Sequence, residues 1–151
     1  MSLLADITRI IAVPWYSPGF PEAWREYADS VQRARACDVS NREVRQLVAV
    51  FLKTPTGCRV TEVVQDCDGL GLCLNYSCLL ADWLVERGYP AFVEYIEVRR
   101  RPHWVAILGE VRIDLTMRQF RQNAAFPYFS RVARFQSADI TECLSGRVTA
   151  C

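Results

Sequence analysis

The hydrophobic period of the chain changes once, near Pro90, and this change limits the folds that are open to it. Before Pro90, apolar residues recur at helical spacing, which is typical of amphipathic helices. After Pro90, the runs AFVEYIEV, HWVAIL and VRIDL are short and separated by turn residues, which is typical of strands. Helices in the first part and strands in the second predict an α+β domain, in which a helix packs on a small antiparallel sheet.

Helices are predicted for several segments before Pro90. Ser40 is followed by Glu43 in a capping-box signature, which predicts a helix that begins at Asn41. The segment 58–66 is ambiguous, because VTEVVQ fits either a strand or a short helix. The predicted helices are LLADITRIIAV near the start of the chain, Glu22 to about Arg35, Asn41 to about Leu52, and about Leu72 to Arg87.

The last of these helices is the best supported by its pattern. At ~100° per residue its apolar side chains fall on one face, and Cys73 lies within that stripe. Cys78 is predicted to lie on the opposite side, and Gly88 supplies the expected stop. The residues of the predicted apolar face are Leu72, Tyr76, Leu79, Leu80, Trp83 and Leu84.

A two-residue turn predicted at Gly109–Glu110 fixes the register of the strands on either side of it. It places Val105 opposite Asp114, so His103 shares a face with Asp114. Diagonal neighbours of this kind have Cα atoms ~7–8 Å apart, within reach of a side-chain hydrogen bond. A one-residue bulge would put the two side chains on opposite faces. The other elements predicted here are a basic turn at Arg99 to Pro102, a loop at AAFPYF, a strand at Arg131 to Phe135 and a short final helix.

The composition excludes several classes of protein. A chain of 151 residues with 51% hydrophobic residues fits one domain, 1–151, with a sizeable core. A formal net charge of +1 gives no electrostatic footprint for nucleic acid or for an anionic membrane. No stretch approaches the ~20 apolar residues of a transmembrane helix, and the N-terminal segment is a poor signal peptide.

The number and spacing of the cysteines indicate the redox environment of the protein. There are seven, an odd number without the spacing of a disulfide framework, which favours free thiols in a reducing environment. We therefore expect a cytosolic protein, in its own cell or in a host.

Three residue types in the second half of the chain have the order of a catalytic triad. The segment DCDGLGLCLNYS delivers Cys73 to the start of a predicted helix, where unpaired N–H groups and the helix dipole favour a thiolate. His103 is the only histidine, and hence the only candidate imidazole base. Asp114 can fix the tautomer of that base and stabilise its protonated form. The sequence thus predicts a thiol nucleophile, its base and the group that orients the base.

The order of these motifs resembles that of papain-like and transglutaminase-like cysteine enzymes. GLCLNYS is followed by a helix, then by PAFVEYIEV, PHWVAI and IDLTMRQF, and the resemblance covers roughly residues 66 to 120. Cys73, His103 and Asp114 match the triad of that superfamily position by position. The short separations look most like compact bacterial papain-fold toxin or effector domains, several of which deamidate glutamine side chains. Papain itself has a glutamine where Cys67 stands, and its CGSCW-type signature is absent here.

The resemblance implies a papain-like catalytic core at 66–136, with residues 1–60 as extra N-terminal helices of one domain. It implies a thiol-dependent amide hydrolase or acyl transferase that needs no cofactor or metal and acts on a protein substrate. Glutamine deamidation by a toxin or effector is favoured over peptide cleavage, and transglutamination stays open. In related dermonecrotic-toxin domains a glutamine shortly after the aspartate assists the oxyanion, and Gln119 has that placement. Trp104 is expected to pack beside the site and to line the substrate groove.

Each residue of the predicted site also has a purely structural interpretation. A lone cysteine such as Cys73 is more often a small buried hydrophobe than a nucleophile. His103 can be a core histidine, Asp114 can end a strand or pair with an arginine, and Gln119 can be structural. A fold of this type without activity would be a module that binds a partner protein.

Two other features have open interpretations. The run Arg99 to Arg101 is either a solvated turn or, because it borders His103, a contact for an acidic partner. Structural zinc is disfavoured, because the candidate ligands contain no CxxC pair. Those candidates are Cys58, Cys67, Cys73 and Cys78.

Overall fold

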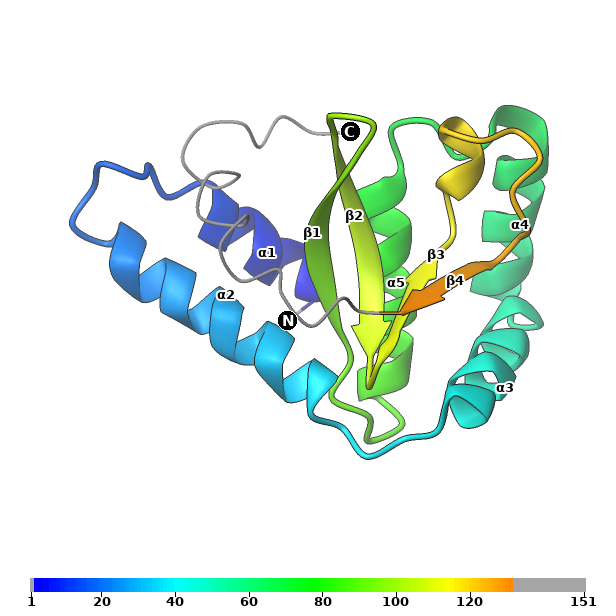
Figure 1. The fold of residues 1–151 in the computed structure, drawn as a ribbon, viewed down its shortest axis with the longest axis horizontal. Coiled ribbons are helices and arrows are strands. Elements are labelled where there is room, and N and C mark those ends of the chain that lie inside the picture. Colours follow the sequence, from blue (N-terminus) through cyan, green and yellow to red (C-terminus); the bar gives the residue numbers. More distant parts are fainter. Residues whose placement is uncertain (1, 132–151) are drawn as a thin grey trace.

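The structure of the chain, a computed structural model, describes residues 2–131, and within that range it contains five α-helices and one four-stranded sheet (Figure 1). This architecture confirms the predicted α+β class. None of the helices in this range combines the length and the apolar character that a membrane crossing requires. The helices are α1 (Leu3–Ile11), α2 (Phe20–Arg35), α3 (Asn41–Leu52), α4 (Pro55–Cys67) and α5 (Cys73–Val85), and a 3-10 helix, η1, spans Met117–Gln119.

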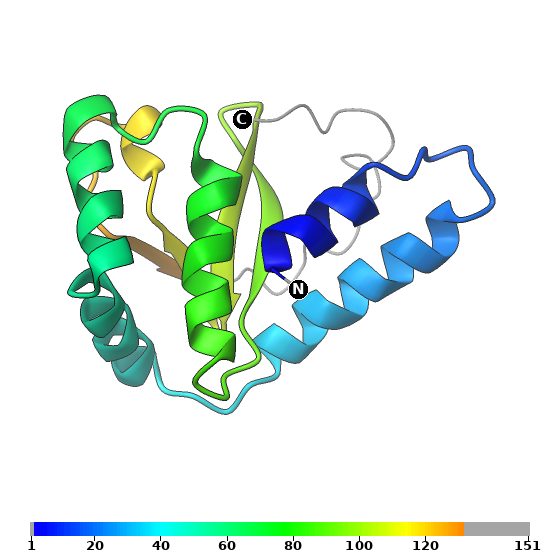
Figure 2. The same cartoon turned by 180° about the vertical axis from the view of Figure 1, so that it is seen from behind.

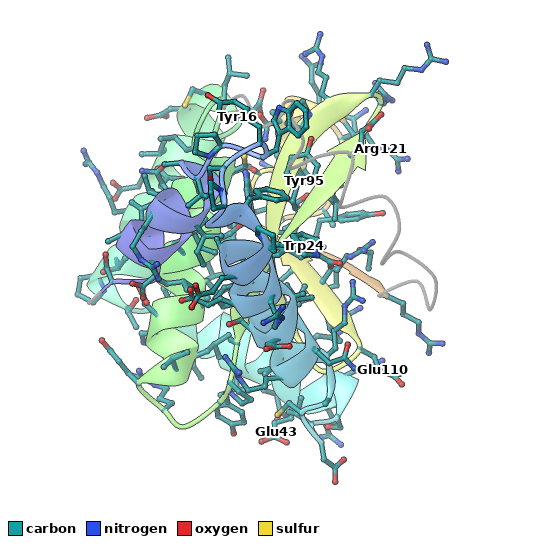
Figure 3. The ribbon with its side chains drawn as sticks, turned by 90° about the vertical axis from the view of Figure 1, so that its left-hand side faces the viewer. Tyr16, Trp24, Glu43, Tyr95, Glu110 and Arg121 are labelled. Atoms are coloured by element: carbon teal, nitrogen blue, oxygen red, sulfur yellow. The ribbon has the colours of Figure 1, made fainter. Side chains whose placement is uncertain are left out.

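The sheet is an antiparallel meander whose strands lie side by side in sequence order. Its strands are β1 (Phe92–Val98), β2 (Arg101–Leu108), β3 (Val111–Asp114) and β4 (Tyr128–Arg131). Figures 1 and 2 show α5 behind the sheet in one view and in front of it in the opposite view, so this helix covers one face. Helix α1 packs against α5, and α2 lies against β1 and β2. The side view in Figure 3 shows two layers, with α1 and α5 on one side and the strands of the sheet on the other.

Local signals explain where two of the helices begin. The Ser40 hydroxyl accepts the backbone N–H of Glu43 at 3.1 Å, so α3 starts at Asn41 as predicted. The ambiguous segment 58–66 belongs to helix α4. That helix begins at Pro55, and the Thr54 hydroxyl caps its first turn.

The predicted face of α5 is wrong in two places. Cys78, placed on the solvent side by the pattern, is only 1% exposed, whereas Leu79, placed on the buried side, is 41% exposed. The reason is that α5 is surrounded: α1, α3 and the sheet all pack against it. A helix contacted from several directions buries more than one stripe, and its sequence pattern does not show which side stays open.

Both hairpins between the central strands have two-residue turns. Leu108 pairs with Val111 and Ala106 with Ile113, which confirms the register predicted from Gly109–Glu110. At the other turn, Val98 pairs with Arg101. Strand β4 shares only Arg131 with the strand predicted at 131–135, and it begins at Tyr128, inside the segment AAFPYF that was predicted as a loop. Residues 132–135 and the predicted final helix lie outside the described residues.

The turn between β1 and β2 has an unusual backbone. Arg99 and Arg100 have φ angles of 50° and 63°, so both central residues are left-handed, as in a type I′ turn. This conformation costs each residue with a Cβ atom roughly 1–2 kcal/mol of conformational energy. Asparagine followed by glycine is therefore the usual pair in such a turn. The predicted basic turn is thus confirmed, with Arg101 and Pro102 already in β2.

A buried carboxylate joins α2 to the sheet. The Glu94 side chain, 1% exposed, accepts from Arg112 Nε at 2.9 Å and also pairs with the guanidinium of Arg35. In the same region the Tyr27 hydroxyl accepts the backbone N–H of Tyr95 at 2.9 Å. The helical first part of the chain therefore shares its core and its polar contacts with the sheet.

We expect Glu94→Ala to lower the free energy of unfolding by about 3–5 kcal/mol, because it leaves two guanidinium groups without their buried partner. Glu26→Ala is the matched control. Glu26 pairs with Arg9 at 2.8 Å on the surface, and its loss should change stability by less than about 1 kcal/mol. Urea denaturation of both variants checks this, and equal losses would contradict it.

Candidate active site

The register of β2 and β3 brings His103 and Asp114 together. His103 Nε2 lies 2.7 Å from Asp114 Oδ2, and the two side chains are 0% and 3% exposed. This distance confirms the prediction that the two residues share a face within hydrogen-bonding reach. A short contact between an imidazole and a buried carboxylate fixes the orientation of the ring.

The Asp114 carboxylate is itself held in place by the backbone that follows it. Its second oxygen, Oδ1, accepts the backbone N–H of Thr116 at 2.8 Å. An aspartate that bonds the N–H two residues on forms an Asx turn. One carboxylate oxygen is therefore used to orient the group, and the other faces His103. The ring of Phe120 lies edge-on to His103, with 4.8 Å between ring centroids, and packs against its side.

Gln119 lies at the other nitrogen of the imidazole. Its Nε2 is 3.4 Å from His103 Nδ1 and 3.0 Å from Thr116 Oγ1. Because Asp114 accepts at Nε2, the neutral ring carries its proton there and has its lone pair on Nδ1. The amide of Gln119 is thus next to the nitrogen that would accept a proton; the expected role of Gln119 at the oxyanion stays a prediction.

Cys73 is the first residue of α5, and two contacts place this end of the helix close to the pair. One turn further on, the Ser77 hydroxyl donates to the carbonyl of Trp104, the neighbour of His103, at 3.1 Å. In the loop before the helix, a Cβ atom on Gly69 would lie 2.6 Å from Thr116 Cγ2. The chain on both sides of Cys73 therefore contacts the segments that carry His103 and Asp114.

The start of α5 has the features expected of an anion-binding helix end. Its N-cap residue is Leu72, and no side chain caps the first turn. The helix dipole favours negative charge at this end of the helix. A thiolate on Cys73 and an oxyanion next to it would both be stabilised in this position.

The cysteines differ in state. Cys73 is 1% exposed and is in a disulfide in the structure. The other described cysteines, which are Cys37, Cys58, Cys67 and Cys78, are free thiols. The expectation of free thiols thus holds for these four and not for Cys73. Burial, with a smaller contribution from Asp82, raises the pKa of the Cys78 thiol to about 12, so Cys78 stays protonated at neutral pH.

Trp104 does not lie where a substrate would contact it. The side chain is 1% exposed, and its ring packs edge-on against Tyr27 and Tyr95. Neighbouring residues of a strand point to opposite faces, so Trp104 points away from the face that carries His103. We assign it to the core, in place of the predicted role in the substrate groove.

Residues 2–131 contain no group of three or more histidine, cysteine, aspartate or glutamate side chains arranged to hold a metal ion. Comparisons with protein-family models, curated proteins and solved structures find no match to the chain. The papain-like assignment therefore stays a prediction, and the site is interpreted from its own geometry.

Sequence reasoning missed Thr116, which connects the parts of the site. Its N–H orients Asp114, its hydroxyl accepts from Gln119, and its methyl group lies against Gly69. The pattern Asp-x-Thr at 114–116 is compatible with an Asx turn and was a usable signal. Its role becomes visible only when the loop before α5 is placed against it.

The contact between Gly69 and Thr116 can be tested against a second glycine. Gly69 has φ +71° and no room for a Cβ, whereas Gly88 has φ +87° and nothing within 4 Å of an added Cβ. Alanine at either position strains the backbone, by about 1–2 kcal/mol, but only Gly69→Ala also displaces Thr116. We expect Gly69→Ala to lower the free energy of unfolding more than Gly88→Ala, as measured by urea denaturation. Equal losses would show that this close approach is unimportant.

Proposed function

We propose that the protein is a cysteine amide hydrolase that deamidates glutamine side chains of a protein substrate. The observation that carries the proposal is the buried His103–Asp114 pair, at 2.7 Å. The segments that hold this pair contact the chain on both sides of Cys73, through Ser77 with Trp104 and Gly69 with Thr116. The Gln119 amide, with its Nε2 3.4 Å from His103 Nδ1, adds a donor at the same place. The choice of glutamine as substrate is supported by the resemblance to deamidase domains.

The chemistry follows from the positions of these groups. His103 Nδ1 takes the proton of the Cys73 thiol, and the thiolate attacks the carbon of the side-chain amide. The electron pair of the C=O bond moves to the oxygen, which Gln119 and the N–H groups at the start of α5 stabilise. When the C–N bond breaks, the imidazolium gives its proton to the leaving nitrogen, and ammonia departs. A thioester is left on Cys73.

Water completes the cycle. His103 removes a proton from the water, which attacks the thioester carbon, and the C–S bond breaks. The imidazolium returns this proton to the Cys73 sulfur, which becomes a thiol again, and the substrate leaves as glutamate. Throughout, Asp114 stabilises the imidazolium through Nε2 and keeps the lone pair of the neutral ring on Nδ1.

This chemistry needs the reduced form of Cys73. A disulfide sulfur cannot attack an amide, and the Cys73 side chain is buried in the structure. A thiol reductant must therefore open the disulfide, and the sulfur must become accessible, before a substrate can bind. The proposed enzyme is therefore inactive while Cys73 is in a disulfide and active once that bond is reduced.

We expect ammonia release from glutamine-containing proteins only in the presence of a thiol reductant. Cys73→Ser and His103→Asn should each lower the rate by about a thousandfold or more, and Asp114→Asn by a factor between about 10² and 10⁴. Cys78→Ser is the matched control, because it removes a buried thiol from the same helix outside the proposed site. Retained activity in Cys73→Ser would refute the proposal.

Alkylation of the reduced protein tests the nucleophile without a substrate. Cys73 and Cys78 are equally buried residues of one helix, but the pKa of Cys78 is raised to about 12 and Cys73 begins the helix near His103. With limiting iodoacetamide near neutral pH, we expect Cys73 to be labelled well before Cys78, and His103→Asn to slow that labelling. Peptide mass mapping provides the readout; similar rates for both thiols would argue for a non-catalytic module.

A further inference from the structure

The tip of the β1–β2 hairpin carries side chains that its backbone does not favour. Arg99 and Arg100 occupy the two left-handed positions of the turn, where asparagine and glycine are the residues without strain. Unfavourable backbone conformations of this kind are concentrated at functional sites, where the surrounding structure holds them in place. Folding alone does not explain two consecutive arginines at these positions.

The arginines at this tip are available for binding. Arg99, Arg100 and Arg101 are all exposed, and none of them forms an ion pair with another residue of the described part of the chain. Together with the one acidic residue nearby, Glu97, they leave a local net charge of +2. The whole chain carries only +1, so this charge is local and does not reflect general basicity.

The same strand connects the tip to the proposed site. Arg101 is two residues before His103 in β2, and side chains two apart on a strand point to the same face, ~7 Å from each other. A substrate segment bound at the tip would therefore have its next few residues at the imidazole. Two residues after Gln119 in the sequence, Arg121 is also exposed.

From this placement we propose that the hairpin tip, Arg99 to Arg101, is the docking element for an acidic segment next to the target glutamine of the protein substrate. The inference rests on the proposed function, and it narrows the substrates to proteins with acidic residues next to the target glutamine. Guanidinium groups bind carboxylates through paired hydrogen bonds, and the rigid two-residue turn presents them in a fixed arrangement. An acidic protein segment fits better than nucleic acid, because the neighbouring site is built for amide chemistry and the chain as a whole is nearly neutral.

A turn replacement separates docking from stability. Arg99→Asn combined with Arg100→Gly introduces the residues that a type I′ turn prefers, so we expect a higher melting temperature. The same variant should raise KM for an acidic substrate about fivefold to tenfold and leave kcat unchanged, since His103 and Gln119 are untouched. Arg25→Gln with Arg42→Gln is the control, because it removes the same charge from exposed positions of α2 and α3. An unchanged KM in the turn variant would overturn the inference.

Binding measured without turnover distinguishes this inference from the proposed function. The probes are fluorescent peptides with a glutamine flanked on both sides by glutamate, serine or lysine, together with a duplex RNA of similar length. Fluorescence anisotropy with the reduced Cys73→Ser protein should show tightest binding for the glutamate peptide, weakened by salt and by the turn replacement. Equal binding of the three peptides, or tighter binding of the RNA, would overturn the docking inference. A glutamate preference that depends on the tip, without ammonia release by the wild-type protein, would support docking and refute only the deamidase function.

Discussion

The two-residue turn between β2 and β3 is the constraint on which the rest of the site depends. Gly109 adopts φ +59°, its N–H donates to the carbonyl of Ala34 at the end of α2, and an added Cβ would lie 2.9 Å from Val39 Cγ1. Helix α2 and the segment after it thus hold the turn in place. One extra residue there would move Asp114 to the opposite face and separate it from His103. The geometry of the imidazole–carboxylate pair is therefore set at the far end of the hairpin.

The buried ion cluster has a related role for the first part of the chain. The Glu94 carboxylate pairs with Arg112 of the sheet and with Arg35 of α2. Separation of α2 from the sheet would break the pair with Arg35 and leave Glu94 with one of its two partners, which is costly for a buried charge. Because α2 also holds the turn at Gly109, the N-terminal helices support the site although they contribute none of its proposed catalytic groups. This explains why a segment outside the resemblance to papain-like enzymes is part of the same core.

Features of the fold with a local cause could be predicted from the sequence. The start of α3 follows from the cap at Ser40, and the contact of His103 with Asp114 follows from the length of one turn. Features that depend on packing could not. The burial of Cys78 results from helices that approach α5 from several sides, and the buried position of Trp104 results from aromatic neighbours distant in sequence. The disulfide state of Cys73 is likewise not visible in cysteine spacing.

Thr116 has a consequence for how the site can vary. A single residue orients the carboxylate through its N–H and receives the Gln119 amide through its hydroxyl. Asp114 and Gln119, which contact the two nitrogens of His103, are both hydrogen-bonded to Thr116, so a shift of one would move the other. Substitutions on the two sides of the imidazole should be strongly non-additive, since residues that share a partner are energetically coupled. In the proposed enzyme, the orientation of the base and the support of the oxyanion would then both depend on one residue, Thr116.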